Sequence, residues 1–182
     1  MAFNTCTLAA DRLKSTNCGY SLNQVVDIYL ANYADVTSTT LSEEGNEVSA
    51  IVLAASKKFW HIEPSKKSAS WSDGLRFTGS NTRYKHHSLT FSVGGKYDKD
   101  GVDFLDALSQ GRFIAVVKTS DGSYLMLGRT TGVETSEDDN TINQGSGDPT
   151  GESGMTFTLS ADLEESALPL AETAVQTVLG VA

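Results

Sequence analysis

Three histidines are the first residues to consider for chemistry, because imidazole serves as a metal ligand and as an acid or base near neutral pH. His86 and His87 are adjacent in a segment with strand character, so their side chains point to opposite faces and cannot share one metal ion. His61 stands apart, and the sequence has none of the short His or Cys spacings typical of metal sites. We therefore expect neither a metal ion nor any other cofactor.

The acidic segment 98–103 (DKDGVD) superficially resembles a calcium-binding loop. An EF-hand loop needs glycine at its sixth position and a bidentate glutamate at its twelfth. Counted from Asp98, Gly101 is only the fourth residue and Ser109 is the twelfth. A polar turn that leads into a helix is the better interpretation.

Two catalytic or phosphate-binding motifs are incomplete. Residues 151–154 (GESG) are one residue short of the G-x-S-x-G nucleophile elbow, and residues 94–96 (GGK) are followed by Tyr97 instead of Ser or Thr. A dispersed Ser-His-Asp triad leaves no sequence signature and would need a pocket that joins a histidine to a carboxylate. We predict no catalytic residues and expect that the protein is not an enzyme.

The overall composition restricts the partners. Hydrophobic residues make up 39% of the 182 residues, which favours one folded domain, and the formal net charge is −9. This charge disfavours non-specific binding to nucleic acid and to anionic membranes. No signal peptide or membrane-spanning segment is evident, so we expect synthesis in a cytoplasm. Cys6 and Cys18 are too few for a disulfide scaffold; we expect reduced thiols, with a disulfide as the alternative.

Alternating apolar and polar residues, rich in β-branched and aromatic types, predict a mainly β domain. The expected strands are 24–30, 50–54, 58–63, 68–72, 84–93, 112–119, 123–129, 132–135 and 155–163. The pair Asp121–Gly122 predicts a hairpin turn. The spacing of Val102, Leu105 and Leu108 predicts one helix over residues 102–110, with Gly111 as its left-handed stop.

Two segments fall outside this pattern. Residues 136–154 are almost free of apolar side chains and are expected to form a long loop, which is usually functional or disordered. Residues 1–165 form the predicted domain, and residues 166–182 form a C-terminal extension. This extension either forms a weak helix or extends, and it packs on its own domain, on a neighbour, or on nothing.

The stretch 18–37 (CGYSLNQVVDIYLANYADVT) resembles the opening of tail tube and tail ring proteins from tailed bacteriophages of the Bacteroidetes, including the crAss-like group. The later order is similar: a helix, the strand 112–119, a hairpin with GSYLMLGR, and a Gly-rich loop before the closing strand 155–163 (MTFTLSADL). The resemblance covers most of residues 18–164. It implies a tail-tube-like antiparallel β-sandwich or partial barrel with one flanking helix.

The resemblance also implies a structural virion protein of the phage tail, made in the host cytoplasm. Its partners would be copies of itself in a hexameric or dodecameric ring and other tail or portal-proximal proteins, without any membrane. DNA would be non-specific cargo, since an acidic channel lets DNA slide. In such a ring the long loop can order on a neighbour, so the candidate subunit-contact residues are Glu137, Asp138, Asp139, Asn140 and Asp148.

Two other classes of function remain open. A carbohydrate- or cell-surface-binding β-sandwich of a phage tail would expose Trp60 or Trp71 in a groove, whereas core packing is the default expectation for both. An enzyme with a dispersed site ranks third.

Overall fold

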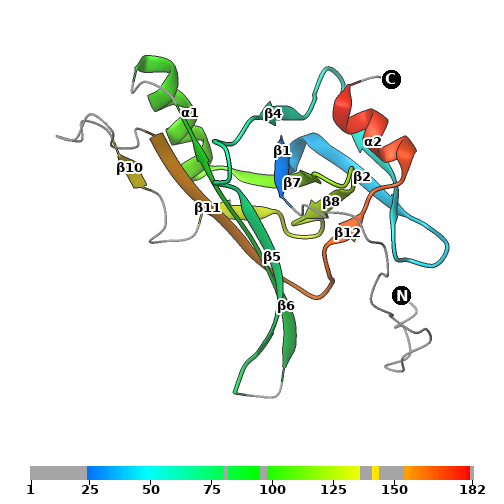
Figure 1. The fold of residues 1–182 in the computed structure, drawn as a ribbon. Coiled ribbons are helices and arrows are strands. Elements are labelled where there is room, and N and C mark those ends of the chain that lie inside the picture. Colours follow the sequence, from blue (N-terminus) through cyan, green and yellow to red (C-terminus); the bar gives the residue numbers. More distant parts are fainter. Residues whose placement is uncertain (1–23, 80–81, 95–97, 136–140, 144–153, 181–182) are drawn as a thin grey trace, which may run out of the picture.

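The computed structural model describes residues 24–79, 82–94, 98–135, 141–143 and 154–180 (Figure 1). The fold is mainly β and antiparallel, as predicted. The strands are β1 (Val25–Asn32), β2 (Val36–Leu41), β3 (Val48–Leu53), β4 (Trp60–Ile62), β5 (Ser70–Phe77), β6 (Arg83–Val93), β7 (Arg112–Thr119), β8 (Tyr124–Leu127), β9 (Val133–Thr135), β10 (Thr141–Asn143), β11 (Gly154–Leu163) and β12 (Leu168–Pro169). The helices are η1 (Tyr33–Asp35), α1 (Lys99–Gln110) and α2 (Glu172–Leu179).

One large sheet folds back on itself to form a sandwich. Its first layer has the order β4–β1–β7–β8–β12, and its second layer has the order β9–β11–β6–β5. Strand β7 joins the layers because it pairs with β1 along one edge and with β8 and then β9 along the other. Strands β2 and β3 form a separate hairpin.

The two faces of β7 belong to different cores, as the side-chain period of a strand requires. Phe113, Ala115 and Val117 point into the first core, between the layers, where Phe91 and Phe157 are fully buried. Each such buried large side chain contributes about 1.5–3 kcal/mol by its removal from water. Helix α1 closes one end of this core with Leu108 and with Phe104, whose ring meets Phe157 edge to face.

The second core lies on the opposite face of the first layer, under α2 and the β2–β3 hairpin. Ala174 and Val178, one helical turn apart in α2, are buried there together with Leu170 and Val48. Strand β12 pairs with β8, and the backbone N–H of Ala171 donates to Val48 O at 2.9 Å. The C-terminal extension therefore packs on its own domain, the first of the three arrangements that the sequence left open.

Helix α1 begins three residues before the predicted start, at Lys99. The Asp98 side chain caps it by accepting from the Gly101 N–H at 3.0 Å. The predicted left-handed stop at Gly111 is wrong, because its φ is −87°. Glycine is needed for space instead: a Cβ would lie 2.2 Å from the Phe113 ring and 2.6 Å from the Ala107 carbonyl oxygen.

Several elements were not predicted. Strand β2 is rich in Thr and Ser and lacks an apolar alternation, and β5 continues past residue 72 through exposed positions. Strand β10 lies within the predicted loop 136–154 and pairs with β11. The turn at Asp121–Gly122 is confirmed, with Gly122 at φ +88°. Neither α1 nor α2 is long and apolar enough to cross a bilayer, among the residues described.

Candidate functional site

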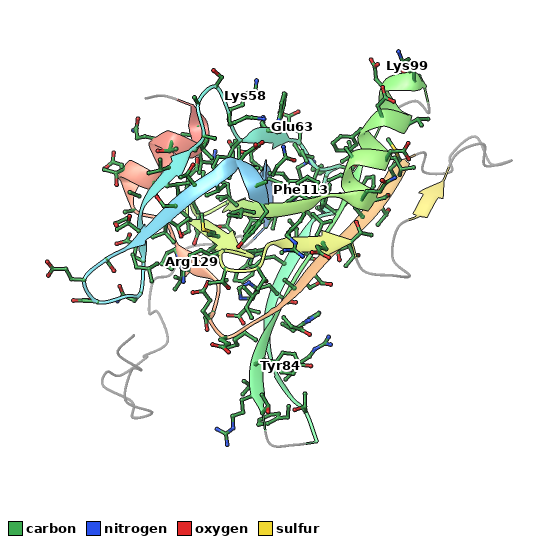
Figure 2. The ribbon with its side chains drawn as sticks, turned by 180° about the vertical axis from the view of Figure 1, so that it is seen from behind. Lys58, Glu63, Tyr84, Lys99, Phe113 and Arg129 are labelled. Atoms are coloured by element: carbon green, nitrogen blue, oxygen red, sulfur yellow. The ribbon has the colours of Figure 1, made fainter. Side chains whose placement is uncertain are left out.

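The β5–β6 hairpin extends beyond the sandwich as a two-stranded ribbon (Figure 1). The last β6 residue that pairs with β11 is Lys85, whereas β5 and β6 remain paired out to Phe77 and Arg83. We call Leu75–Phe77 with Arg83–Tyr84 the arm. Figure 2 shows Tyr84 on the arm at one end of the molecule and Lys99 of α1 at the other.

The arm exposes apolar side chains that continue the core-facing side of β5. Trp71, Leu75 and Phe77 share one face of β5, and Trp71 packs against the first core. Leu75 and Phe77 continue that inward face past the end of the opposite layer, so they are 53% and 61% exposed. The Arg83 guanidinium lies over the Phe77 ring, 5.5 Å from its centre, yet Phe77 remains 61% exposed.

A group of polar residues fixes the arm to the body; we call Asp73, Lys85 and His87 the base cluster. Asp73 Oδ2 accepts from the Ala167 N–H at 3.1 Å, and Lys85 Nζ lies 3.3 Å from Asp73 Oδ1. The base cluster thus ties β5 and β6 to the segment that leads from β11 to β12. Nearby, Arg129 binds both carboxylate oxygens of Glu165.

His87 is the most deeply placed member of the base cluster, at 1% exposure. The Gly128 N–H donates to His87 Nδ1 at 3.4 Å, which assigns the ring proton to Nε2. His87 Nε2 lies 3.9 Å from Asp73 Oδ1 and makes no hydrogen bond. Burial lowers the pKa of His87 below its usual value, although the Asp73 carboxylate and the backbone and carboxylate of Glu165 oppose that change.

A second group of ionisable side chains lies on the first layer, on the face that also carries the second core. Ile28 pairs with Ile62 and Tyr29 with His61, so Asp27 and Glu63 fall opposite each other beyond that pairing. His61 Nε2 lies 2.9 Å from Asp27 Oδ1, and Lys118 Nζ of β7 lies 3.2 Å from Asp27 Oδ2. The Tyr29 ring stacks on the His61 ring at 4.9 Å between centres.

The ion pairs of Asp27 set its charge. Burial alone would raise the pKa of the Asp27 carboxyl, but the hydrogen bonds from His61 and Lys118 outweigh burial and lower it. Asp27 is therefore ionised at neutral pH. Donor atoms of Asp27, His61 and Glu63 all lie within 4.8 Å of one another, so these three side chains could hold a metal ion. No other such group of three occurs in the described part of the chain.

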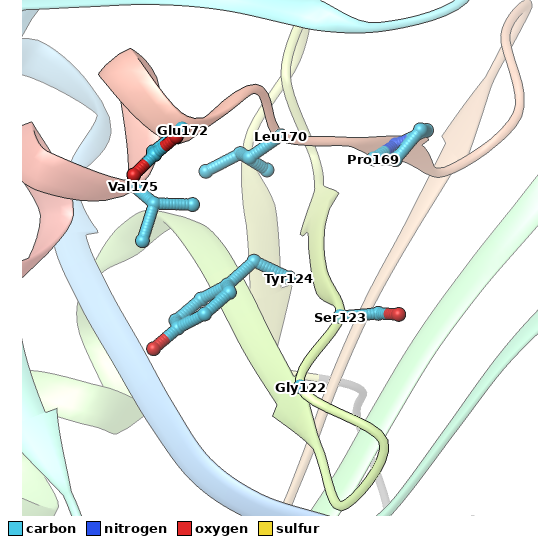
Figure 3. A pocket seen from close by; sticks show the side chains of 7 residues that line it. All are labelled: Gly122, Ser123, Tyr124, Pro169, Leu170, Glu172 and Val175. Carbon is cyan, nitrogen blue, oxygen red and sulfur yellow. The ribbon is translucent and has the colours of Figure 1, made fainter.

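A shallow hollow of about 340 Å³ lies between β8, β12 and α2 (Figure 3). Its walls are Gly122, Ser123, Tyr124, Pro169, Leu170, Glu172 and Val175. None of the three histidines lines it, so it does not join an imidazole to a carboxylate as a dispersed hydrolytic site would require.

The structure separates the histidines as the strand pattern predicted. His86 Nδ1 lies 2.7 Å from Asp162 Oδ1 at the surface, whereas His87 faces inward. The grouping of Asp27 with His61 and Glu63 was not foreseen, because it depends on the pairing of β1 with β4 and leaves no short motif. The five candidate contact residues, Glu137, Asp138, Asp139, Asn140 and Asp148, lie outside the described residues, as do Cys6 and Cys18.

The tryptophans differ from each other. Trp71 packs partly against the first core, as expected, but Trp60 is 58% exposed, with Lys58 Nζ 4.5 Å from its ring centre. Trp60 does not line the hollow.

No family model matches this chain, and comparisons with curated proteins and with solved structures found no similar protein.

Proposed function

We propose that this protein is a structural subunit that assembles with copies of itself into rings or a tube, as part of the tail channel of a bacteriophage. The observation that carries the proposal is the uncovered apolar face of the arm. Leu75 and Phe77 belong to the core-facing side of β5 yet have no opposing layer within the described residues. Exposed large apolar side chains that lie together mark sites of protein contact.

The charges of the molecule favour contact between unlike surfaces. The arm and the adjoining residue carry Arg76, Arg83 and Lys85, although the chain as a whole is acidic. At the opposite end, α1 exposes Asp103 and Asp106. A subunit with complementary patches at two different places makes head-to-tail contacts, which close into a ring where the rotation permits.

The virion setting, the passage of DNA and the companion tail proteins rest on the sequence resemblance. The mainly β sandwich with α1 at one end agrees with the fold that this resemblance implies. The net charge of −9 suits a channel that releases DNA.

The test is the mass in solution, measured by light scattering on a sizing column and followed by negative-stain imaging. We expect rings or stacked tubes of the unmodified chain. The double variant Leu75→Ser/Phe77→Ser should elute as a monomer, because it removes the apolar contact at exposed positions without disturbing either core.

Val52→Ser is the matched control, since Val52 is 49% exposed on β3, away from the arm. This variant should assemble like the unmodified chain. A monomer of the unmodified chain at every concentration would contradict self-assembly. Rings of the double variant would contradict the role of the arm.

A carbohydrate-binding role is the second candidate, and the exposure of Trp60 favours it. Aromatic faces on protein surfaces can stack on sugar rings, but the Lys58 ammonium already occupies one side of this indole. A glycan screen of the unmodified chain and of Trp60→Ala separates the two functions. A carbohydrate-binding module should bind a specific glycan and lose that binding in Trp60→Ala, whereas an assembly subunit should bind no specific glycan.

A further inference from the structure

We propose that Asp27, His61 and Glu63 bind one divalent metal ion of the Zn²⁺ type, and that this ion fastens the edge strand β4 to β1. This inference is independent of the assembly proposal. It rests on the convergence of one imidazole and two carboxylates from neighbouring strands, with donor atoms within 4.8 Å of one another.

The spacing of the donors is close to what a metal ion requires. Two ligands of a tetrahedral zinc ion, each about 2.0–2.1 Å from the metal, lie about 3.3 Å apart. His61 Nε2 and Asp27 Oδ1 are 2.9 Å apart, so a small separation would admit the ion between them. Glu63 is exposed and lies one residue beyond the end of β4, two residues after His61, and its carboxylate lies within 4.8 Å of the other two donor atoms.

Two of the three ligands are already oriented by their neighbours. Tyr29 stacks on the His61 ring at an angle of 20° between planes, which fixes the direction of the imidazole. Lys118 holds Asp27 through Oδ2, so Oδ1 remains directed at His61. Groups that orient metal ligands in this way raise metal affinity. The two carboxylates outnumber the Lys118 ammonium, so the site is net negative and favours a cation.

The donor set selects the kind of metal. An imidazole nitrogen with carboxylate oxygens suits Zn²⁺ and similar transition metals, whereas Ca²⁺ and Mg²⁺ prefer sites made only of oxygen. Three protein ligands leave at least one position for water. Because the imidazole must be unprotonated to bind, acid should weaken the metal affinity.

The position of the ligands gives the ion a structural effect. Strand β4 has three residues and pairs only with β1 among the described strands. It carries or adjoins two of the three ligands, and β1 carries the third. A bound ion would therefore bridge β1 and β4 and stabilise the folded chain according to its concentration.

The experiment is a calorimetric titration of the full chain with ZnCl₂ near pH 7.5, together with thermal unfolding with and without zinc. Cys6→Ser/Cys18→Ser is the background, since thiolates also bind zinc. We expect one equivalent bound, a higher unfolding temperature with zinc, and little response to Mg²⁺. His61→Gln and Glu63→Gln should each weaken zinc binding by about tenfold or more and remove the thermal shift.

His86→Gln is the matched control, because His86 and Asp162 form a similar pair at 2.7 Å that has no third ligand in the described residues. It should bind zinc like the background protein. Absence of zinc binding by the folded background protein would overturn the inference, and so would an equal loss in His86→Gln and His61→Gln. Circular dichroism of each variant distinguishes loss of the site from loss of the fold.

Discussion

His87 lies at the base of the arm, where residues from several elements meet. Its Nδ1 accepts a hydrogen bond from the Gly128 N–H, and its pKa is influenced by Asp73, by the backbone and the carboxylate of Glu165, and by Lys85. A neutral imidazole fits this surrounding, because an ionised one would lose its hydration. Protonation of His87 is therefore unfavourable at its buried position at the base of the arm.

We predict that the free energy of unfolding falls as the pH is lowered from 8 to 5. Burial places the pKa of His87 below 6.5 in the folded chain, so the unfolded chain binds more protons in this interval and acid favours unfolding. The stability contributed by neutral, buried His87 is fully present above the pKa of His87 in the unfolded chain. It is lost as the pH falls from that value through the lower pKa in the folded chain. Urea unfolding at each pH measures the effect.

His87→Leu should reduce this dependence on pH, because it removes the buried imidazole that titrates. Aspartates with lowered pKa, such as Asp35 and Asp121, lose their contribution only at more acidic pH. An unchanged pH dependence in His87→Leu would contradict the assignment to His87.

Residue types alone could not reveal the base cluster or the group formed by Asp27, His61 and Glu63. The sequence correctly separated His86 from His87 by their alternation along a strand. It could not bring His61 to Asp27, 34 residues away, because that contact depends on the register of two strands that are not consecutive in the chain. The exposure of Leu75 and Phe77 depends on where the opposite layer ends, which local periodicity does not contain.

At the scale of elements, α2 shows how a short C-terminal helix is stabilised by packing. It has eight residues and no side-chain cap, so by itself it would be marginal. Its stability comes from Ala174 and Val178, which enter the second core. Substitutions in α2 should therefore lower the stability of the protein only where they fall on the face that enters the second core.

We predict that Val178→Ala lowers the free energy of unfolding by about 1–2 kcal/mol, because it leaves a small cavity in a buried site. Leu179→Ala, at the next position and 42% exposed, should change it by less than about 0.5 kcal/mol. Chemical denaturation of the two variants makes the comparison. Equal effects would show that α2 does not pack as described.

The predicted elements agree with the structure where the sequence pattern is strong. Strand β7 (RFIAVVKT) has the predicted bounds, because its β-branched and aromatic residues strongly favour a strand. Strand β2 was missed because its Thr and Ser residues are also common in loops. Helix α2 remained an alternative because its partner, β3, lies more than a hundred residues earlier in the chain.

At the scale of the whole molecule, the arm and α1 give the protein two chemically different ends. The arm is apolar and basic, and α1 is acidic on its exposed side, so the two ends of the molecule differ in chemistry as well as in shape (Figure 2). Two unlike ends are what the proposed head-to-tail contact between copies requires. The sequence supplied the mainly β class of this molecule, but the opposition of its two ends required the three-dimensional arrangement.

The pairing of β7 along both of its edges also predicts the order in which the strands separate and exchange their amide protons. Because both edges of β7 are occupied, its amides should exchange with deuterium only when the whole sheet separates, whereas β4 can open alone. Hydrogen–deuterium exchange followed by mass spectrometry should find residues 113–118 among the last to exchange and residues 60–62 much earlier. Equal rates would contradict this order. If residues 113–118 are the last to exchange, solvent reaches the strand that joins the two layers only after the rest of the sheet has opened.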